Sequence, residues 1–189
     1  ALAASHKKYP HVINMNHVRV FNADDASIVS LPAYYNATYL HCPEGCQYFA
    51  EDVAALELFA AKTTAPVRVI TAHGPPRMTT AEGLDRIHDG VNVGDQDLAN
   101  FLAVKKLFPF GLFGNIQEAG GHATTLAGKK LPPEAFHDSL YLNPGPADHV
   151  PWSMLDGTSS FGMAGLLRIK GKQGAYKVRR LKEGEAKVE

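Results

Sequence analysis

Three short β-prone runs in this chain each end in a compact turn of glycine, proline and polar residues. The runs and the polar residues that follow them are 67–71 with His73, 110–113 with Asn115 and Gln117, and 140–142 with Asn143. In open α/β sheets, ligands collect beyond the carboxyl ends of the strands. The pattern therefore predicts three turns that converge on one site. The alternative is that glycine and proline only reverse the chain, and that the polar side chains satisfy loop amides.

The segments around these runs predict helices that alternate with strands, and a hairpin near each end of the chain. The expected helices are 53–62 and 96–107, the second capped by Asp95, and the expected hairpins pair 18–21 with 27–31 and 163–169 with 175–181. Such an order is typical of an α/β sheet of mixed direction. We expect one domain over 1–189, with a frayed charged tail at 182–189.

Charge and hydropathy exclude several classes of function. The chain has 189 residues, of which 45% are hydrophobic, and its 19 Lys and Arg balance 19 Asp and Glu. A net charge of zero argues against a surface built for nucleic acid or for an anionic membrane. No apolar run approaches the roughly 20 residues that span a bilayer. We therefore expect neither nucleic acid nor membrane as a partner. The compartment stays open, with the cytoplasm favoured.

The two cysteines form a single C-x3-C pair, Cys42 and Cys46, on a segment with proline and glycine. Both a disulfide that closes a short loop and a reduced pair are compatible with this spacing. One pair is too few for a disulfide framework, and no second pair completes a four-cysteine zinc site. The cysteines therefore leave the redox compartment open.

Taken in order, three segments resemble the C-terminal half of a calcineurin-like metallophosphoesterase. They are Thr71-Ala72-His73-Gly74-Pro75-Pro76, Phe113-Gly114-Asn115-Ile116-Gln117-Glu118-Ala119-Gly120-Gly121, and Asn143-Pro144-Gly145. The resemblance covers roughly residues 26 to 180. It implies a metallophosphoesterase-like sandwich of mixed β-sheets flanked by helices, with the N-terminal part of that fold expected to be absent from this chain.

The resemblance also implies roles for individual residues. His73 matches a ligand of the second metal, Asn115 stands where a histidine of the family binds that metal, and Gln117 stands where a histidine binds the first metal. The implied cofactors are divalent Mn, Fe or Zn. Amide oxygens are weaker ligands than imidazole for these metals. Arg77, just beyond His73, is the candidate for binding a substrate phosphate through its guanidinium fork, or else a solvated loop charge.

The N-terminal half of the family motif has no counterpart here. The family carries a D-x-H pair and a bridging Asp in a GD segment, whereas this sequence contains no D-x-H. Its Gly94-Asp95 follows His73 in order, and we interpret it as a helix cap. Hydrolysis with two metals needs a carboxylate that bridges cations ~3.5–4 Å apart. An enzyme of this type would therefore need those groups from another segment or another chain.

Two functions follow from the sequence as hypotheses. The first is a metal-dependent phosphoesterase that hydrolyses a small-molecule phosphate ester through a metal-bound hydroxide, together with an N-terminal half supplied elsewhere. The second is a catalytically inactive binding module that keeps the metallophosphoesterase fold. A third, weaker possibility is a fragment that pairs with another chain.

Overall fold

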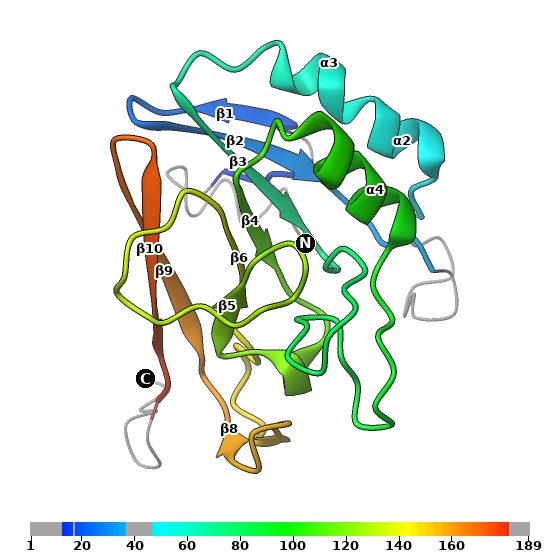
Figure 1. Ribbon diagram of the computed structural model, residues 1–189, viewed down its shortest axis with the longest axis vertical. Helices are drawn as coiled ribbons and strands as arrows, with labels where there is room; N and C mark the ends of the chain where they lie inside the picture. Colours follow the sequence, from blue (N-terminus) through cyan, green and yellow to red (C-terminus); the bar gives the residue numbers. More distant parts are fainter. Residues whose placement is uncertain (1–12, 17, 37–46, 182–189) are drawn as a thin grey trace.

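The computed structural model describes residues 13–16, 18–36 and 47–181, and shows a mixed α/β structure built on one large sheet (Figure 1). The expected frayed tail at 182–189 and the Cys42–Cys46 pair lie outside the described residues. The coarse α/β expectation is confirmed. The described part contains a six-stranded mixed sheet and two separate two-stranded sheets.

The large sheet has the strand order β1-β2-β3-β4-β6-β5. Its strands are β1 (Val20–Asn22), β2 (Ala26–Leu31), β3 (Val67–Ala72), β4 (Phe110–Phe113), β5 (His122–Thr124) and β6 (Leu140–Asn143). The four central strands β2, β3, β4 and β6 are parallel, and the edge strands β1 and β5 pair antiparallel with their neighbours. All four central strands therefore end at the same edge of the sheet.

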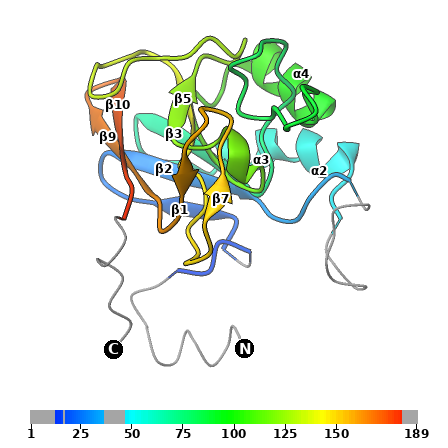
Figure 2. The same ribbon diagram turned by 90° about the horizontal axis from the view of Figure 1, so that it is seen from below.

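Three helices cover one face of this sheet (Figure 2). They are α2 (Ala50–Ala54), α3 (Leu56–Ala60) and α4 (Gln96–Lys105). Their buried residues, among them Val53, Leu56 and Leu98, form one core with every second residue of the central strands. Parallel strands need crossover connections, and these helices supply two of them. The predicted cap is confirmed, because the Asp95 carboxylate accepts a hydrogen bond from the Asp97 N–H at 2.8 Å.

A long antiparallel hairpin packs against the opposite face. It consists of β9 (Ala164–Lys170) and β10 (Gln173–Arg179), as the sequence predicted. Tyr176 of β10 is buried with Val69 and Phe110 in a second core, and its hydroxyl donates to the Leu131 carbonyl at 2.8 Å. The molecule thus has three layers, with the helices on one side of the sheet and the hairpin on the other (Figure 2).

Two expectations about secondary structure are wrong in detail. The single helix predicted over 53–62 is two short helices, because the ψ of Ala55 is −15° rather than the helical value near −42°. The sequence also failed to indicate the edge strand β5, the 3-10 turn η2 (Gln117–Ala119), and the small sheet of β7 (Trp152–Ser153) and β8 (Ser159–Ser160). These elements are only two or three residues long, which is too short for a periodic pattern.

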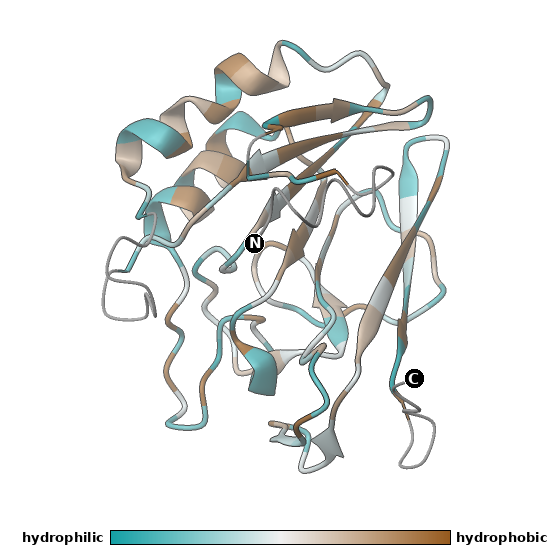
Figure 3. Ribbon diagram, turned by 180° about the vertical axis from the view of Figure 1, so that it is seen from behind, coloured by the Kyte–Doolittle hydropathy of each residue, from teal (hydrophilic) through white to brown (hydrophobic). Residues whose placement is uncertain are grey.

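Hydrophobic residues are concentrated in the strands of the central sheet. The strands of the central sheet are largely brown in Figure 3, whereas the short η2 turn at the carboxyl edge is teal. Within the described residues, no helix is long and apolar enough to cross a membrane.

Candidate functional site

The turn after β3 and the turn after β4 lie side by side at the carboxyl edge of the sheet. Ala72 is paired with Phe113 in the parallel register of these strands. One residue further on, the Gly114 N–H donates to the His73 carbonyl oxygen at 3.0 Å. The turns that carry His73 and Asn115 are therefore neighbours, as the prediction required, although this contact by itself does not place their side chains in one site.

The turn after β6 joins the same cluster through backbone and side chain. Asn143 is only 1% exposed, and its Nδ2 donates to the Ile116 carbonyl at 2.8 Å while its Oδ1 accepts from the Gly145 N–H at 3.0 Å. The Asn143 carbonyl accepts from the Gly121 N–H at 2.8 Å. This asparagine holds the neighbouring turn in place. It therefore fits the alternative interpretation, in which polar residues at the strand ends satisfy backbone groups of the loops.

Asn115 and Gln117 are presented by an unusual local backbone. Asn115 has a φ of 64°, in the left-handed region that asparagine tolerates better than most residues. The η2 turn follows at once, with the Gln117 N–H bonded to the Asn115 carbonyl at 3.1 Å. Both side chains are half-buried and line one cleft. The structure therefore brings these two predicted site residues together.

His73 and Arg77 are placed differently. The His73 side chain is exposed, and its ring meets the edge of the Tyr34 ring at a centroid distance of 5.5 Å. Neither His73 nor Arg77 lines the cleft that holds the two amides. The Arg77 N–H donates to the Asp95 carbonyl at 2.8 Å, and its side chain is exposed. The backbone of this segment is thus fixed against the start of α4.

The cleft itself has a volume of about 450 Å³, within the range of small-molecule sites. It opens between the strand-end turn of β4, the loop over 87–93 and strand β7. Its lining comprises Ile87, His88, Asp89, Val93, Asn115, Ile116, Gln117, Glu118 and Trp152. Two carboxylates and two amides therefore face a partly apolar, aromatic wall.

Hydrogen bonds connect the three walls of the cleft. The Nε2 of His88 lies 3.1 Å from the Ser153 carbonyl, and the Leu155 N–H donates to the Glu118 carbonyl at 2.9 Å. The indole N–H of Trp152 points to the carboxylate of Asp148, at 3.2 and 3.3 Å from its two oxygens. The walls are therefore built into the fold and do not need a ligand to assemble them.

Buried carboxylates near the cleft serve the fold. Asp85 is fully buried and accepts hydrogen bonds from the Met78 and Gly94 N–H groups at 3.0 Å and from the Asn92 side chain at 2.7 Å. Asp95 accepts from the Tyr48 hydroxyl at 2.6 Å, and burial together with this bond raises the pKa of Tyr48 well above its usual range. The interpretation of Gly94-Asp95 as structural is consistent with these bonds.

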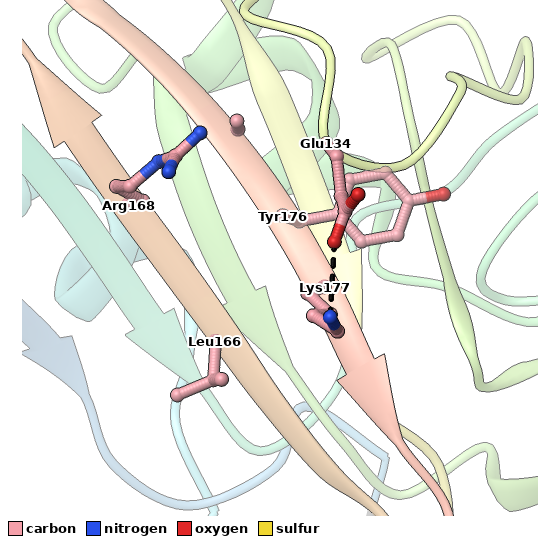
Figure 4. Close-up of a pocket in the computed structure, with 6 residues that line it drawn as sticks. Glu134, Leu166, Arg168, Tyr176 and Lys177 are labelled. Carbon is pink, nitrogen blue, oxygen red and sulfur yellow. Dashed lines mark ion pairs between the residues drawn. The ribbon is translucent and has the colours of Figure 1, made fainter.

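Of two further cavities, one lies away from the cleft and one adjoins it. A groove on the outer face of the β9–β10 hairpin is crossed by an ion pair between Glu134 and Lys177 at 3.0 Å (Figure 4). The groove lies on the hairpin and not at the strand ends. Its ion pair is largely exposed, so this pair contributes little to stability.

The other cavity, of about 190 Å³, adjoins the cleft, because Glu118 lines both, and it lies between the 81–83 segment and Arg180. Partial burial alone would raise the pKa of Asp156 there, but hydrogen bonds from Thr158 and from Arg180 lower it to about 2. The guanidinium also donates to Ser160 at 3.0 Å. These bonds tie the end of β10 to the small β7–β8 sheet.

The side chains present do not fit a centre with two transition metals. Among the described residues, no group of three or more His, Cys, Asp or Glu is placed to hold a metal ion. The family-matched set is one exposed imidazole, from His73, and the two neutral amides of Asn115 and Gln117. Such a set lacks the charge and the bridging carboxylate that two divalent ions require. No catalytic step can be derived through metals held by these residues alone.

Comparison with known proteins adds no constraint. A scan against protein-family models matched no family, and searches of curated proteins and of solved structures found no similar chain.

Sequence reasoning missed four residues of the cleft: His88, Asp89, Glu118 and Trp152. They come from three segments that are distant in sequence, and no spacing rule brings them together. Trp152, the only tryptophan of the chain, is 37% exposed and anchors its loop through the indole N–H, which donates to Asp148. The sequence signal for this wall is a single tryptophan that follows a proline-rich segment.

Proposed function

We propose that this chain is a binding module with a metallophosphoesterase-like sandwich, and that it binds a polar small molecule in the cleft at the carboxyl edge of its sheet. The single observation that carries the proposal is the placement of Asn115 and Gln117. Both amides line a preformed cleft at the ends of parallel strands, where ligands of open α/β sheets collect. An amide both donates and accepts hydrogen bonds, and is therefore suited to a neutral polar ligand.

The second candidate is the metal-dependent phosphoesterase that the motif order suggests. It is favoured by the hydrogen bond from the Gly114 N–H to the His73 carbonyl, which sets the two family-like turns next to each other. This function requires further ligands from outside the described residues or from another chain. Mn, Fe or Zn would then supply the nucleophile by lowering the pKa of a bound water, and Arg77 would be the candidate for binding the phosphate.

One comparison separates the two candidates. The chain is titrated with Mn²⁺ by calorimetry and assayed for hydrolysis of bis(p-nitrophenyl) phosphate, alongside His73→Ala and the double variant N115H/Q117H. The binding module predicts neither saturable Mn²⁺ binding nor hydrolysis in the wild type. It also predicts stronger Mn²⁺ binding in the double variant, because imidazoles replace amides. Mn²⁺-dependent hydrolysis by the wild type that His73→Ala abolishes would overturn the binding module.

The proposed binding of a polar small molecule is tested with a thermal-shift screen of neutral and charged compounds. A ligand at 100 times its Kd stabilises the folded chain by about 2.7 kcal/mol. We expect at least one compound to raise the Tm, and the Gln117→Ala variant to weaken its binding at least tenfold. Glu134→Gln, in the separate hairpin groove, is the matched control and should bind as the wild type does. A screen without any Gln117-dependent ligand would contradict the proposal.

A further inference from the structure

Trp152 and the polar residues Asn115, Gln117 and Glu118 belong to one lining but come from two neighbouring segments. The tryptophan belongs to β7, whereas Asn115, Gln117 and Glu118 belong to the turn after β4. In Figure 1 the green η2 turn and the orange β7–β8 segment lie together at the lower end of the molecule, in agreement with the hydrogen bond between Leu155 and Glu118. The cleft thus places an aromatic ring and several hydrogen-bonding groups around one space.

The tryptophan ring is oriented before any ligand binds. Its indole N–H is directed to Asp148, and its neighbour Ser153 is bonded through the backbone carbonyl to His88 on the facing loop. The residue as a whole is 37% exposed. An aromatic ring held in this way offers a flat apolar face whose polar N–H is already satisfied.

The charge of the cleft excludes one class of ligand. Asp89 and Glu118 contribute carboxylates, and none of the described residues that line the cleft is Lys or Arg. Two negative groups without a Lys or Arg beside them in this lining repel a phosphate or another anion. A phosphate ester is therefore a poor occupant of this cleft.

The hydrogen-bonding pattern argues against a second class. An ammonium ligand such as choline would suit the carboxylates and the tryptophan face, but it offers at most one hydroxyl as acceptor for the amide NH₂ groups of Asn115 and Gln117. A hydroxyl group both donates and accepts, so it matches amides and carboxylates together. The ligand that fits is a compact ring with an apolar face and several hydroxyls around its rim.

We infer that this cleft is a carbohydrate site, in which a neutral sugar ring stacks on Trp152 and its hydroxyls bind Asn115, Gln117, Asp89 and Glu118. The inference rests on the proposed binding function and adds the class of ligand. It also gives the side-chain amides of Asn115 and Gln117 a function, which is to bind sugar hydroxyls.

The test uses the single tryptophan as its own reporter. Intrinsic fluorescence of the chain is titrated with glucose, galactose, mannose, N-acetylglucosamine, maltose and cellobiose, and with glucose 6-phosphate, inorganic phosphate and choline for comparison. We expect a saturable change with at least one neutral sugar. Glucose 6-phosphate should bind at least tenfold more weakly than that sugar, and choline should give no saturable change.

Variants of lining residues test whether the sugar binds in this cleft. Gln117→Ala and Asp89→Asn should each weaken sugar binding at least fivefold with the far-UV circular dichroism unchanged. By calorimetry, Trp152→Phe should keep most of the affinity that Trp152→Ala loses, since phenylalanine retains an aromatic face. Glu134→Gln is the control outside the cleft and should match the wild type.

Three results overturn the sugar assignment. They are a fluorescence response that persists unchanged in Gln117→Ala, a Gln117-dependent response to phosphate or choline only, and no response to any neutral sugar. The second would leave the cleft as a binding site and replace only its ligand class. The third, combined with Mn²⁺-dependent hydrolysis that His73→Ala abolishes, would reject the binding module itself.

Discussion

The side-chain amide of Asn143 donates to the Ile116 carbonyl at 2.8 Å, and so joins the end of β6 to the turn that presents Asn115 and Gln117. The same asparagine accepts from the Gly145 N–H with its Oδ1. One buried residue thereby supports both the local turn after its own strand and the cleft wall beside it. Its replacement should affect stability and ligand binding together.

Asn143→Ala is expected to lower the free energy of unfolding by about 1–3 kcal/mol, because it removes one donor from the buried Ile116 carbonyl and leaves the half-buried Gly145 N–H without its acceptor. Urea denaturation measures the change. Asn100→Ala, on the exposed surface of α4, is the matched control and should stay within about 0.5 kcal/mol of the wild type. Equal stability of the two variants would show that Asn143 does not support the turn.

A pair of glycines tests how tightly the strand-end turns pack. A Cβ added to Gly120 would lie 2.2 Å from the Cα of Gly145, whereas one added to Gly114 would meet its nearest atom, the His73 carbonyl oxygen, at 3.6 Å. Gly120→Ala should therefore destabilise the fold by about 1–3 kcal/mol or more, and Gly114→Ala by less than about 1 kcal/mol. Thermal unfolding of both variants checks the difference. A tolerated Gly120→Ala would contradict the close approach of the two turns.

The hydrogen bond between Tyr48 and Asp95 joins the segment before α2 to the N-terminus of α4. Tyr48→Phe leaves the buried carboxylate with one partner fewer and should cost about 1–3 kcal/mol. A double-mutant cycle with Asp95→Asn isolates the pair, for which we expect a coupling energy of about 0.5–3 kcal/mol. Additive effects would show that the two side chains do not interact.

His122 makes stability depend on pH. Burial lowers its pKa below 6.5, more than the hydrogen bond with the Glu82 carbonyl raises it. The unfolded chain therefore takes up a proton near pH 6.5 while the folded chain does not, so stability is complete above pH 6.5 and falls as the pH drops toward the folded pKa. His122→Gln should flatten this fall in urea midpoints between pH 7.5 and pH 5.

The matched control for that measurement is His149→Gln, which removes an exposed imidazole. If His122→Gln and the wild type lose the same stability over this pH range, the buried imidazole is not the source of the dependence.

Much of the fold followed from local patterns. The runs at 67–71, 110–113 and 140–142 are short, apolar and bounded by glycine or proline, and each is a parallel strand of the central sheet. Their common direction requires that the turns after them share one edge. The sequence could therefore predict that the turns after β3 and β4 are neighbours, because this follows from topology alone.

The cleft could not be predicted in the same way. His88 and Asp89 lie on a loop and Trp152 on the two-residue strand β7, and their meeting depends on single contacts such as that between His88 and the Ser153 carbonyl. The motif resemblance directed attention to metal ligands, whereas the chemistry of the lining depends on which loops close over the strand ends. A loop's path is set by tertiary contacts that leave no periodic trace in the sequence.

The most direct test of the account is a ¹⁵N correlation spectrum of the chain, recorded first with substoichiometric Mn²⁺ and then with the neutral sugar that gives the largest fluorescence change. We predict that the sugar shifts the side-chain amide signals of Asn115 and Gln117 and the indole signal of Trp152, and that Mn²⁺ broadens none of them selectively. Selective broadening around His73, Asn115 and Gln117 by Mn²⁺, with no shift from any sugar, would contradict the account and favour a metal-dependent phosphoesterase.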